Sequence, residues 1–217
     1  MKNCRLVRSF WFFFLVVILV NTGVFASQSG DSVLIDDFES YGHDGNDISD
    51  FWVDPSGENY LSIQLADSPV DSGVNSMELS YVNHFGPYYS EAQREFEPAQ
   101  DWTGIGIKTL AISYYGKSYN FGHPIYITIT DALMNSVTIN HPDIDMSKYQ
   151  EWRQWNIDLG SLSGIDLSQV VSLTIGTGDG IDRNGWGVID HLWIDDIVLK
   201  KDAANYSSEP YPADGAS

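Results

Sequence analysis

The sequence predicts an all-β protein built from two packed antiparallel sheets. From residue 31 to residue 201, short runs alternate between apolar and polar residues, and clusters of Gly, Pro, Asn and Asp separate them. This is the pattern of strands joined by turns. No apolar stripe with the helical period reaches helical length in this region. About ten strands in a chain of this size are typical of a sandwich of two sheets.

Five candidate strands lie in the first half of this region. The segment 33–35 is an uninterrupted apolar triplet. The segments 60–65 and 76–81 place an apolar side chain at every second position, as a strand with one buried face requires. The segment 91–96 alternates less regularly and ends in Phe, whereas 109–115 is rich in β-branched and aromatic residues, which favour strands.

Five further candidates follow in the second half. The segment 124–130 carries Ile at every second position, and 136–139 joins Val and Ile to polar residues. The segment 151–159 ends in the alternation of Trp155, Ile157 and Leu159, so we expect Trp155 in the core. The last two candidates, 170–175 and 191–199, are mostly apolar and complete the predicted sandwich.

The N-terminus has the three-part layout of a secretory signal. Basic residues occupy positions 2, 5 and 8, an apolar run covers 10–20, and the segment ends in Val24-Phe25-Ala26. The apolar run is shorter than the about 20 residues that span a bilayer. We predict a signal peptide over 1–26, a β-sandwich domain over 27–201 and a disordered tail over 202–217, in a protein that is secreted, periplasmic or at the cell surface.

The chain is strongly acidic and has a single cysteine. Its formal charge at pH 7 is -19, and loss of the three basic residues of the signal would leave 8 basic against 30 acidic residues, or -22. Such a field repels phosphate backbones and anionic lipids, so we expect no nucleic-acid partner and no membrane partner after cleavage. The cysteine, Cys4, lies within the predicted signal, so the mature domain depends on its core rather than on disulfides.

Four stretches across the predicted domain carry a family resemblance: 35–41, 89–96, 152–159 and 192–199, which read IDDFESY, YSEAQREF, WRQWNIDL and LWIDDIVL. The chain resembles the galactose-binding-like jelly rolls of extracellular carbohydrate-binding modules. It is most similar to a module of secreted proteins of marine and planctomycete-type bacteria that often stands beside laminin-G-like domains. The resemblance implies a jelly-roll sandwich and a non-catalytic function with a polysaccharide or glycan as partner. Modules with this scaffold differ in ligand, so the function must be argued from the site.

The resemblance also implies that the first and last strands are neighbours, with a structural calcium close to them. That pairing would bring the acidic residues of 36–39 next to those of 194–197. Repelling carboxylates attract a counter-ion, and calcium prefers oxygen donors. We therefore predict a calcium site formed by Asp37, Glu39 and Asp196. The alternative is that these acids are solvated strand ends or turn caps.

The alternation of the last strand leaves one point open. Ile194 and Ile197 cannot both point into the core unless a bulge or a strand end lies between them. For this reason the sequence does not indicate which of Asp195 and Asp196 faces inward.

A glycan site requires aromatic rings beside polar groups, because sugar C–H faces pack on rings while the hydroxyl groups need hydrogen-bond partners. The best candidate strip is 88–94, in which Tyr89 and Glu91 share one face of a strand. We predict Tyr89, Glu91 and Arg94 as ligand-binding residues, with Tyr126 on a neighbouring strand and Trp186 on a loop. Each aromatic side chain is also a candidate for ordinary core packing.

Two other functions remain open from the sequence. A structural or adhesive module without a sugar site would share the fold and the calcium. A jelly-roll glycoside hydrolase or polysaccharide lyase would need two carboxylates across a cleft, or a Tyr, His and Arg set for proton abstraction. No recognisable catalytic motif or spacing is present, so we predict that the protein is not an enzyme.

Overall fold

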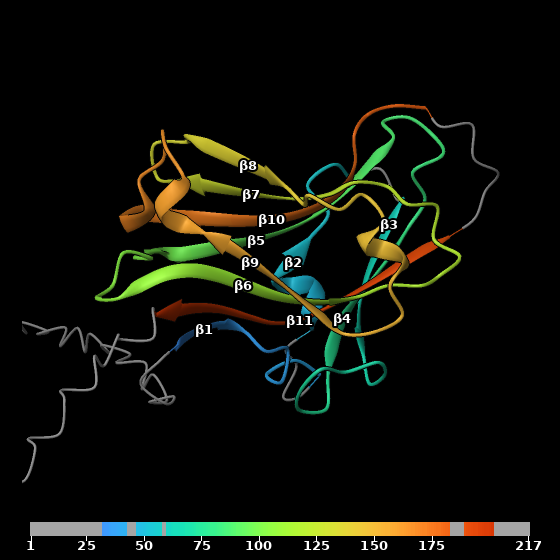
Figure 1. The fold of residues 1–217 in the computed structure, drawn as a ribbon, viewed down its shortest axis with the longest axis horizontal. Coiled ribbons are helices and arrows are strands. Elements are labelled where there is room, and N and C mark those ends of the chain that lie inside the picture. Colours follow the sequence, from blue (N-terminus) through green and yellow to red (C-terminus); the bar gives the residue numbers. More distant parts are fainter. Residues whose placement is uncertain (1–31, 43–46, 58–59, 183–188, 202–217) are drawn as a thin grey trace, which may run out of the picture.

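The protein folds as an antiparallel two-sheet sandwich of the jelly-roll class, which confirms the predicted fold. The structure is a computed structural model and describes residues 32–42, 47–57, 60–182 and 189–201. Sheet A has the strand order β3-β4-β11-β6-β9, with β1 also paired to β11, and sheet B has the order β2-β5-β10-β7-β8. Figure 1 shows β8, β7, β10 and β5 stacked above β6, β11 and β1.

The predicted strands are all present, with ends that differ by a few residues. Sheet A contains β1 (Ser32–Asp36), β3 (Leu61–Ala66), β4 (Ser76–Tyr81), β6 (Ile107–Tyr115), β9 (Arg153–Asp158) and β11 (Asp190–Lys201). Sheet B contains β2 (Trp52–Val53), β5 (Tyr89–Gln100), β7 (Ile125–Asp131), β8 (Ser136–Asn140) and β10 (Val170–Gly178). Strand β2 was not predicted, because two residues are too few to show an alternation.

Short 3-10 helices lie between some of these strands. They are η1 (Ile48–Asp50), η2 (Met146–Lys148), η3 (Leu159–Ser161) and η4 (Leu167–Gln169). In the part of the chain that the structure describes, no helix is long and apolar enough to cross a membrane.

The core forms where the apolar faces of the two sheets meet. In β7, Ile125, Ile127 and Ile129 are at most 1% exposed, whereas the residues between them point outward. Each buried Ile contributes about 1.5–3 kcal/mol relative to an exposed one. Trp155 is also part of this core, as its alternation with Ile157 predicts.

Strands β1 and β11 lie side by side, as the resemblance implies (dark blue and dark red in Figure 1). Strand β11 pairs with β4 through residues 190–194 and with β1 through residues 197–200. A bulge separates the two halves, where Asp196 has φ +46°. The bulge resets the alternation, so Ile194 and Ile197 are both in the core. Of the two alternatives that the sequence left open, a bulge or a strand end, the structure has the bulge.

Candidate functional site

The outer face of sheet B presents polar side chains, because alternation turns the apolar residues of its strands into the core. In β10, Leu173 and Ile175 are core residues, so the positions between and beside them face outward. These outward positions are occupied only by small residues, which are Ser172, Thr174, Gly176 and Gly178. The middle strand of the sheet is therefore a low floor between neighbours with longer side chains.

Tyr126 and Glu91 meet across this floor. Gly176 is the cross-strand neighbour of Glu91 on β5 and of Tyr126 on β7. The Tyr126 hydroxyl donates a hydrogen bond of 2.7 Å to Glu91 Oε1. Burial, and then this bond to Glu91, raise the pKa of Tyr126 well above its ordinary value. The phenol is therefore protonated at neutral pH and acts as the donor.

Further polar groups extend the face on both sides of the floor. Tyr126 is paired with Asn140 on β8, and Thr174 of the floor is paired with Gln93 on β5. A depression of about 350 Å³ opens at the Gly178 end, and it is lined by Tyr89, Tyr126, Thr138, Asn140, Gly178, Asp179 and Gly180. The face thus combines two tyrosines with amide, hydroxyl and carboxylate groups, a set that can both donate and accept hydrogen bonds.

One of the predicted ligand-binding residues does not join this face. Arg94 is out of phase with Tyr89 and Glu91 along β5, so it lies on the opposite side of the sheet. Its guanidinium pairs with the buried Asp36 and donates to the Tyr41 hydroxyl. This placement corrects the prediction that grouped Arg94 with the two outward residues. Trp186 lies outside the described residues.

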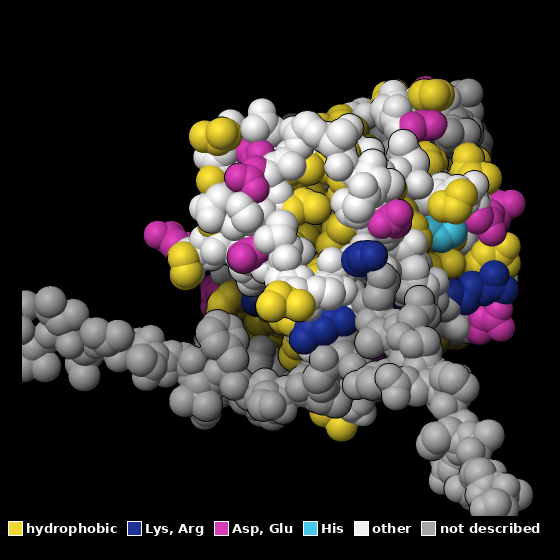
Figure 2. Space-filling view, turned by 60° about the vertical axis from the view of Figure 1, so that its left-hand side comes forward, with side chains coloured by type: hydrophobic (Ala, Val, Ile, Leu, Met, Phe, Trp, Pro, Cys, Tyr) yellow, Lys and Arg dark blue, Asp and Glu magenta, His cyan; other side chains and the backbone are white. Residues whose placement is uncertain are grey.

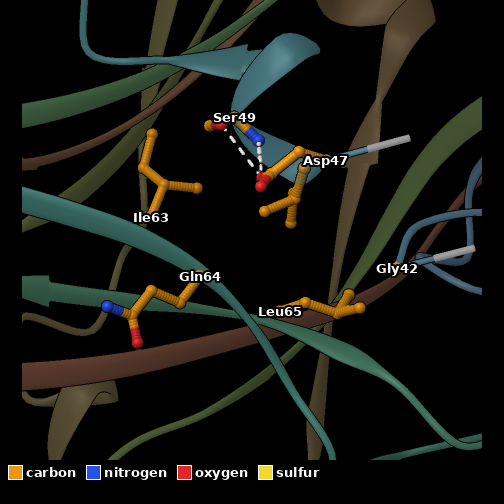
Figure 3. Close-up of a pocket in the computed structure, with 7 residues that line it drawn as sticks. Gly42, Asp47, Ser49, Ile63, Gln64 and Leu65 are labelled. Carbon is orange, nitrogen blue, oxygen red and sulfur yellow. Dashed lines mark hydrogen bonds between the residues drawn. The ribbon is translucent and has the colours of Figure 1, made fainter. Parts of the chain in front are cut away.

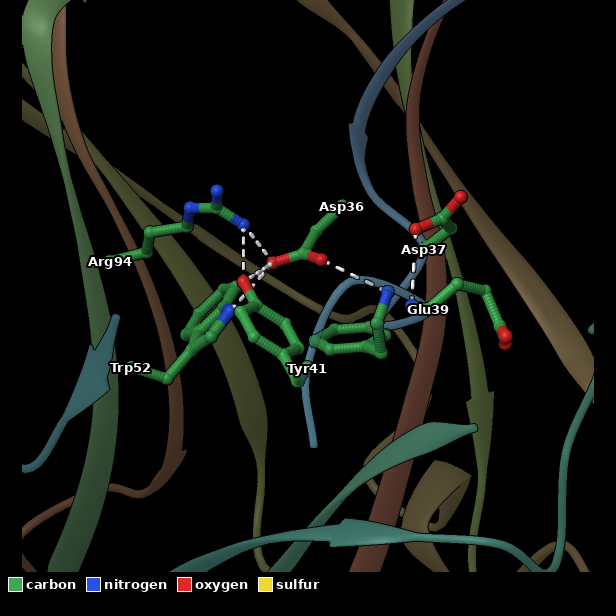
Figure 4. A network of polar contacts seen from close by, with 7 residues as sticks. Asp36, Asp37, Glu39, Tyr41, Trp52 and Arg94 are labelled. Atoms are coloured by element: carbon green, nitrogen blue, oxygen red, sulfur yellow. Dashed lines mark hydrogen bonds and ion pairs between the residues drawn. The ribbon is translucent and has the colours of Figure 1, made fainter. Parts of the chain in front are cut away.

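Asp36 is the centre of a buried polar network (Figure 4). Trp52 Nε1 and Tyr41 Oη donate to Asp36 Oδ2 at 2.9 and 2.7 Å, and the Phe38 N–H donates to Oδ1 at 3.0 Å. The network joins β1 of sheet A to β2 and β5 of sheet B. Arg94 therefore has a structural position in the fold.

The predicted calcium ligands lie around the bulge of β11. Glu39 Oε1 accepts hydrogen bonds from the N–H groups of Val74 and Asn75, at 2.8 and 2.9 Å. Asp196 Oδ1 accepts a bond of 3.0 Å from the Ser72 hydroxyl. These carboxylates therefore hold the loop between β3 and β4 against the β1–β11 pair.

Asp195, which was not predicted as a ligand, is the buried member of this acidic group. It is 0% exposed, and its Oδ2 accepts the N–H groups of Asp71 and Ser72. Burial raises the pKa of Asp195 to about 6, although these hydrogen bonds oppose the shift. Of the two aspartates, the buried one is thus Asp195, which the β3–β4 loop covers.

The remaining acids lie close enough to repel one another. Burial raises the pKa of Asp196, the Ser72 bond opposes the shift, and the charges of Asp71, Asp37 and Glu39 add to it. Figure 4 shows Asp37 and Glu39 on the far side of Asp36 from Arg94. In the described ranges, no three His, Cys, Asp or Glu side chains are arranged so that they could hold a metal ion. The calcium site stays a prediction.

A second pocket, of about 690 Å³, lies between η1 and β3 (Figure 3). It is lined by Gly42, Asp47, Ile48, Ser49, Ile63, Gln64 and Leu65. Asp47 Oδ1 accepts both the N–H and the hydroxyl of Ser49, so this oxygen caps η1. Apolar side chains supply much of the remaining wall. The pocket thus offers a poorer set of polar groups than the outer face of sheet B.

Ser80, His191 and Glu78 form a contact that superficially resembles a hydrolytic triad. Ser80 Oγ and Glu78 Oε1 both lie next to the same ring atom, His191 Nδ1, at 3.1 and 2.8 Å. A Ser-His-acid triad needs the nucleophile on one ring nitrogen and the acid on the other. The arrangement therefore does not have the geometry of an acyl-transfer site.

The acidic residues of the chain do not gather at the end of the sandwich that Figure 2 brings forward. Figure 2 shows Asp and Glu side chains spread over this end, with hydrophobic side chains between them. The exposed hydrophobic residues of the loops include Ile105 and Leu133. Scattered single apolar residues are ordinary on a protein surface, and dispersed negative charge keeps a protein soluble.

The fold places the protein among jelly-roll β-sandwiches, and solved structures of that class resemble it. A family 11 carbohydrate-binding module from Clostridium thermocellum, in complex with a β-1,3-1,4-mixed-linked tetrasaccharide, aligns with a TM-score of 0.53. It is 17% identical in sequence and covers 80% of this chain and 98% of its own. The family 30 module of a cellulosomal cellulase of the same organism has a TM-score of 0.52 and 14% identity, over 70% of this chain and 92% of its own.

An exo-β-agarase also aligns, with a TM-score of 0.57 and 12% identity, over 77% of this chain and 25% of the agarase. No family model and no curated protein matches the sequence. At these identities the likeness is one of fold.

Sequence reasoning missed the glycine floor of β10. The outward residues of this strand are small and its inward residues are apolar. Taken alone, the segment therefore looks like an ordinary buried strand. A usable signal was present in the order Ser, Thr, Gly, Gly at alternate positions 172–178. Only the pairing of β10 between β5 and β7 turns that order into the centre of a face.

Proposed function

We propose that the protein is a non-catalytic carbohydrate-binding module that holds a neutral glycan across the outer face of sheet B. The observation that carries this proposal is the bridge from Tyr126 to Glu91 over the bare backbone of Gly176. The bridge fixes an aromatic ring and a carboxylate side by side above a floor without bulky side chains. A sugar ring can pack its C–H face on such a ring while its hydroxyl groups meet the polar neighbours.

The composition of the face favours a neutral ligand. Glu91, Glu95 and Glu97 alternate along the outward side of β5, and the chain as a whole has a formal charge of -19. An anionic polysaccharide would be repelled by this field. Hydroxyl groups of a neutral sugar can instead donate to Glu91 and accept from the amides of Gln93 and Asn140.

The similar solved structures support this proposal. Two of them are carbohydrate-binding modules, and one was solved with a mixed-linkage tetrasaccharide. The predicted signal peptide is consistent with a protein that meets polysaccharides outside the cell. We therefore include secretion in the proposal.

The position of Glu91 supports a non-catalytic role for this carboxylate. Glu91 and Glu95 lie four residues apart on one strand, which separates their backbones by about 13 Å at about 3.3 Å per residue. The paired carboxyl groups of glycoside hydrolases lie about 5–9.5 Å apart. Glu91 is also engaged by the Tyr126 hydroxyl, so it serves better as a hydrogen-bond acceptor than as a general acid.

The test is a binding measurement on matched variants. The purified protein is run through native gels that contain mixed-linkage β-glucan or agarose, and its retardation is compared with that of Tyr126→Ala, Glu91→Ala and Asn156→Ala. Asn156 is exposed on β9 of sheet A and is the control. We expect both sheet B variants to bind at least about tenfold more weakly, which corresponds to about 1.4 kcal/mol. If all three variants are retarded as strongly as the wild type, the proposed site is wrong.

We also propose that a calcium ion neutralises the acids around the β11 bulge. The donors are hard oxygens, which suit calcium, and the raised pKa of Asp196 reflects repulsion from Asp37 and Glu39 as well as burial. Glu39 Oε1 and Asp196 Oδ1 are engaged by the β3–β4 loop, so Asp37, Glu39 and Asp196 would offer their other oxygens. Bound calcium would supply the positive charge that this part of the fold needs.

Calcium binding is tested by thermal unfolding in calcium and in chelator. A ligand at 100 times its Kd stabilises the folded state by about 2.7 kcal/mol, so we expect a higher midpoint in calcium. Asp196→Asn should lose this increase, whereas Glu97→Gln, an exposed acid on β5, should keep it. Equal midpoints for the wild type in calcium and in chelator speak against the ion.

A further inference from the structure

A cluster of aromatic rings lies on the outer face of sheet A, opposite to the site described above. Trp193 on β11 and Tyr115 on β6 are cross-strand neighbours, and their rings meet edge to face at 5.9 Å. Trp152 lies 5.7 Å from Tyr115. His191, two residues before Trp193, stacks on it at 5.7 Å with 13° between the planes. Tyr119, from the loop after β6, stands edge-on to His191 at 6.4 Å.

The position of Trp193 is unusual for an outward residue. It follows the core residue Leu192 and precedes the core residue Ile194, so its side chain points away from the interior and is not part of the core. Even so, it is only 4% exposed. Its indole N–H is buried and has no hydrogen-bond partner in the described part of the chain. The ring is therefore covered by its aromatic neighbours and by a lysine, without a polar contact of its own.

Polar groups of both kinds surround these rings. Lys117 Nζ lies 5.0 Å from the ring of Trp193 and 5.9 Å from that of Tyr119. Within the described residues, Lys117 has no carboxylate partner. Glu78 on β4 accepts from His191, and the side chains of His191 and Glu78 remain 26% and 23% exposed. Unused donors and acceptors thus lie at the edge of the aromatic surface.

Tyr119 makes this surface accessible. It is 57% exposed, one of the most exposed aromatic side chains in the described residues. A solvent-exposed ring beside polar groups is the kind of surface on which a sugar ring packs. Lys117 is flexible enough to leave the face of Trp193, because long lysine stems lie over apolar surface while the charged end stays in water.

We propose that this cluster is a second sugar site, in which a neutral pyranose ring stacks on Tyr119 next to His191. Lys117 is the donor for its hydroxyl groups, and Glu78 is the acceptor. This inference rests on the proposed function and extends it. With one site on each outer face, a single domain joins two glycan chains rather than holding one.

A purely structural cluster would have the same ring contacts, so the test must separate binding from stability. The ¹⁵N-labelled protein is titrated with the β-1,3-1,4-mixed-linked tetrasaccharide and followed by amide and indole N–H signals. We expect two separate groups of shifting signals, one around Glu91, Thr174 and Tyr126 and one around Lys117, Tyr119 and the indole of Trp193.

Two variants assign the groups. Tyr119→Ala should abolish the shifts on sheet A and leave those on sheet B, and Tyr126→Ala should do the reverse. Tyr119 is largely exposed. The free energy of unfolding of its variant should therefore lie within about 0.5 kcal/mol of the wild-type value, as is usual for surface substitutions. If Tyr119→Ala unfolds much more easily and the wild type shows no shift at Lys117, the cluster is structural and the inference fails.

The outcomes also separate this inference from the proposed function. Shifts on sheet B alone would leave the first site standing and overturn the second. Shifts on sheet A alone would support the second site and remove the first. Absence of shifts on both faces overturns both.

Discussion

The ring of Tyr126 lies directly over the α-carbon of Gly176, its cross-strand neighbour in sheet B. A Cβ added to Gly176 would lie 2.1 Å from Tyr126 Cζ and 2.6 Å from its hydroxyl oxygen. Non-bonded carbon atoms do not approach so closely, so the orientation of Tyr126 depends on the absence of a side chain at position 176. The same absence lets the hydroxyl reach Glu91 on the far side of β10.

Gly176→Ala should therefore displace Tyr126 and weaken the fold. Overpacking of a close-packed site costs about 1–3 kcal/mol, and we expect a loss of this size in urea unfolding. Affinity for the glycan that retards the wild type should also fall, because the ring can no longer lie beside Glu91.

The double variant Gly176→Ala/Tyr126→Ala separates the clash from other effects of alanine. If the clash is the cause, the alanine at position 176 costs little once the ring is gone, so the two changes are strongly non-additive. Additive losses would mean that Gly176 matters for its backbone and not for the Tyr126 contact.

Asp36 is expected to be one of the most sensitive polar positions of the fold. It is 4% exposed and receives Arg94, Tyr41, Trp52 and a backbone N–H. Removing one partner of a buried ion pair costs about 3–5 kcal/mol, because the other charge is left uncompensated. Asp36→Ala should lower the free energy of unfolding by an amount in this range.

Asp50→Ala is the matched control for this loss, since Asp50 is an exposed aspartate in η1. It should change the free energy of unfolding by less than about 0.5 kcal/mol. Equal urea midpoints for the Asp36 and Asp50 variants would show that the network is dispensable.

The strands were predictable because their signal is local. Each residue of 125–129 can be assigned to the core or to the surface from its neighbours in sequence alone, and the structure agrees. The pairing of β1 with β11 came from the resemblance, and the conflict between Ile194 and Ile197 indicated either a bulge or a strand end between them. Alternation alone did not decide that Asp195 is the buried aspartate of the two, because the hydrogen bonds that satisfy it come from Asp71 and Ser72, on a loop far away in sequence.

The site was only partly predictable for a related reason. Tyr89 and Glu91 follow from alternation along one strand, and Tyr126 was placed on a neighbouring strand without knowledge of the spacing between them. That spacing depends on β10, which separates β5 from β7 and brings Gly176 under the ring. Arg94 was grouped with Tyr89 and Glu91 as a ligand-binding residue, although its phase in β5 differs from theirs.

The acid sensitivity of the fold should depend on His141. Its ring lies 4.9 Å from Trp155 and 5.6 Å from Tyr114, edge-on to both. Burial lowers the pKa of His141 below its ordinary value, and a hydrogen bond with the Asp143 backbone opposes the shift. The folded state therefore binds a proton on His141 less readily than the unfolded chain does. In the unfolded chain, histidine has a pKa of about 6.5.

The sign of the effect follows from this difference in proton binding. The contribution of His141 to stability is complete above about pH 6.5 and is lost as the pH falls through the lower pKa of the folded state. Asp195 acts in the opposite sense, because its raised pKa of about 6 makes its contribution fall as the pH rises. The change in total stability with pH is thus a sum of opposing parts, and only a comparison of variants isolates His141.

Urea unfolding of the wild type and His141→Gln at pH 7.5 and pH 5.5 provides that comparison. We expect the wild type to lose more stability than the variant between the two pH values, because glutamine does not titrate. Direct titration of the His141 ring by NMR should give a midpoint below about 6.5. Parallel losses in both proteins, or a ring that titrates at or above the ordinary value, would show that the packing against Trp155 does not disfavour the protonated imidazole.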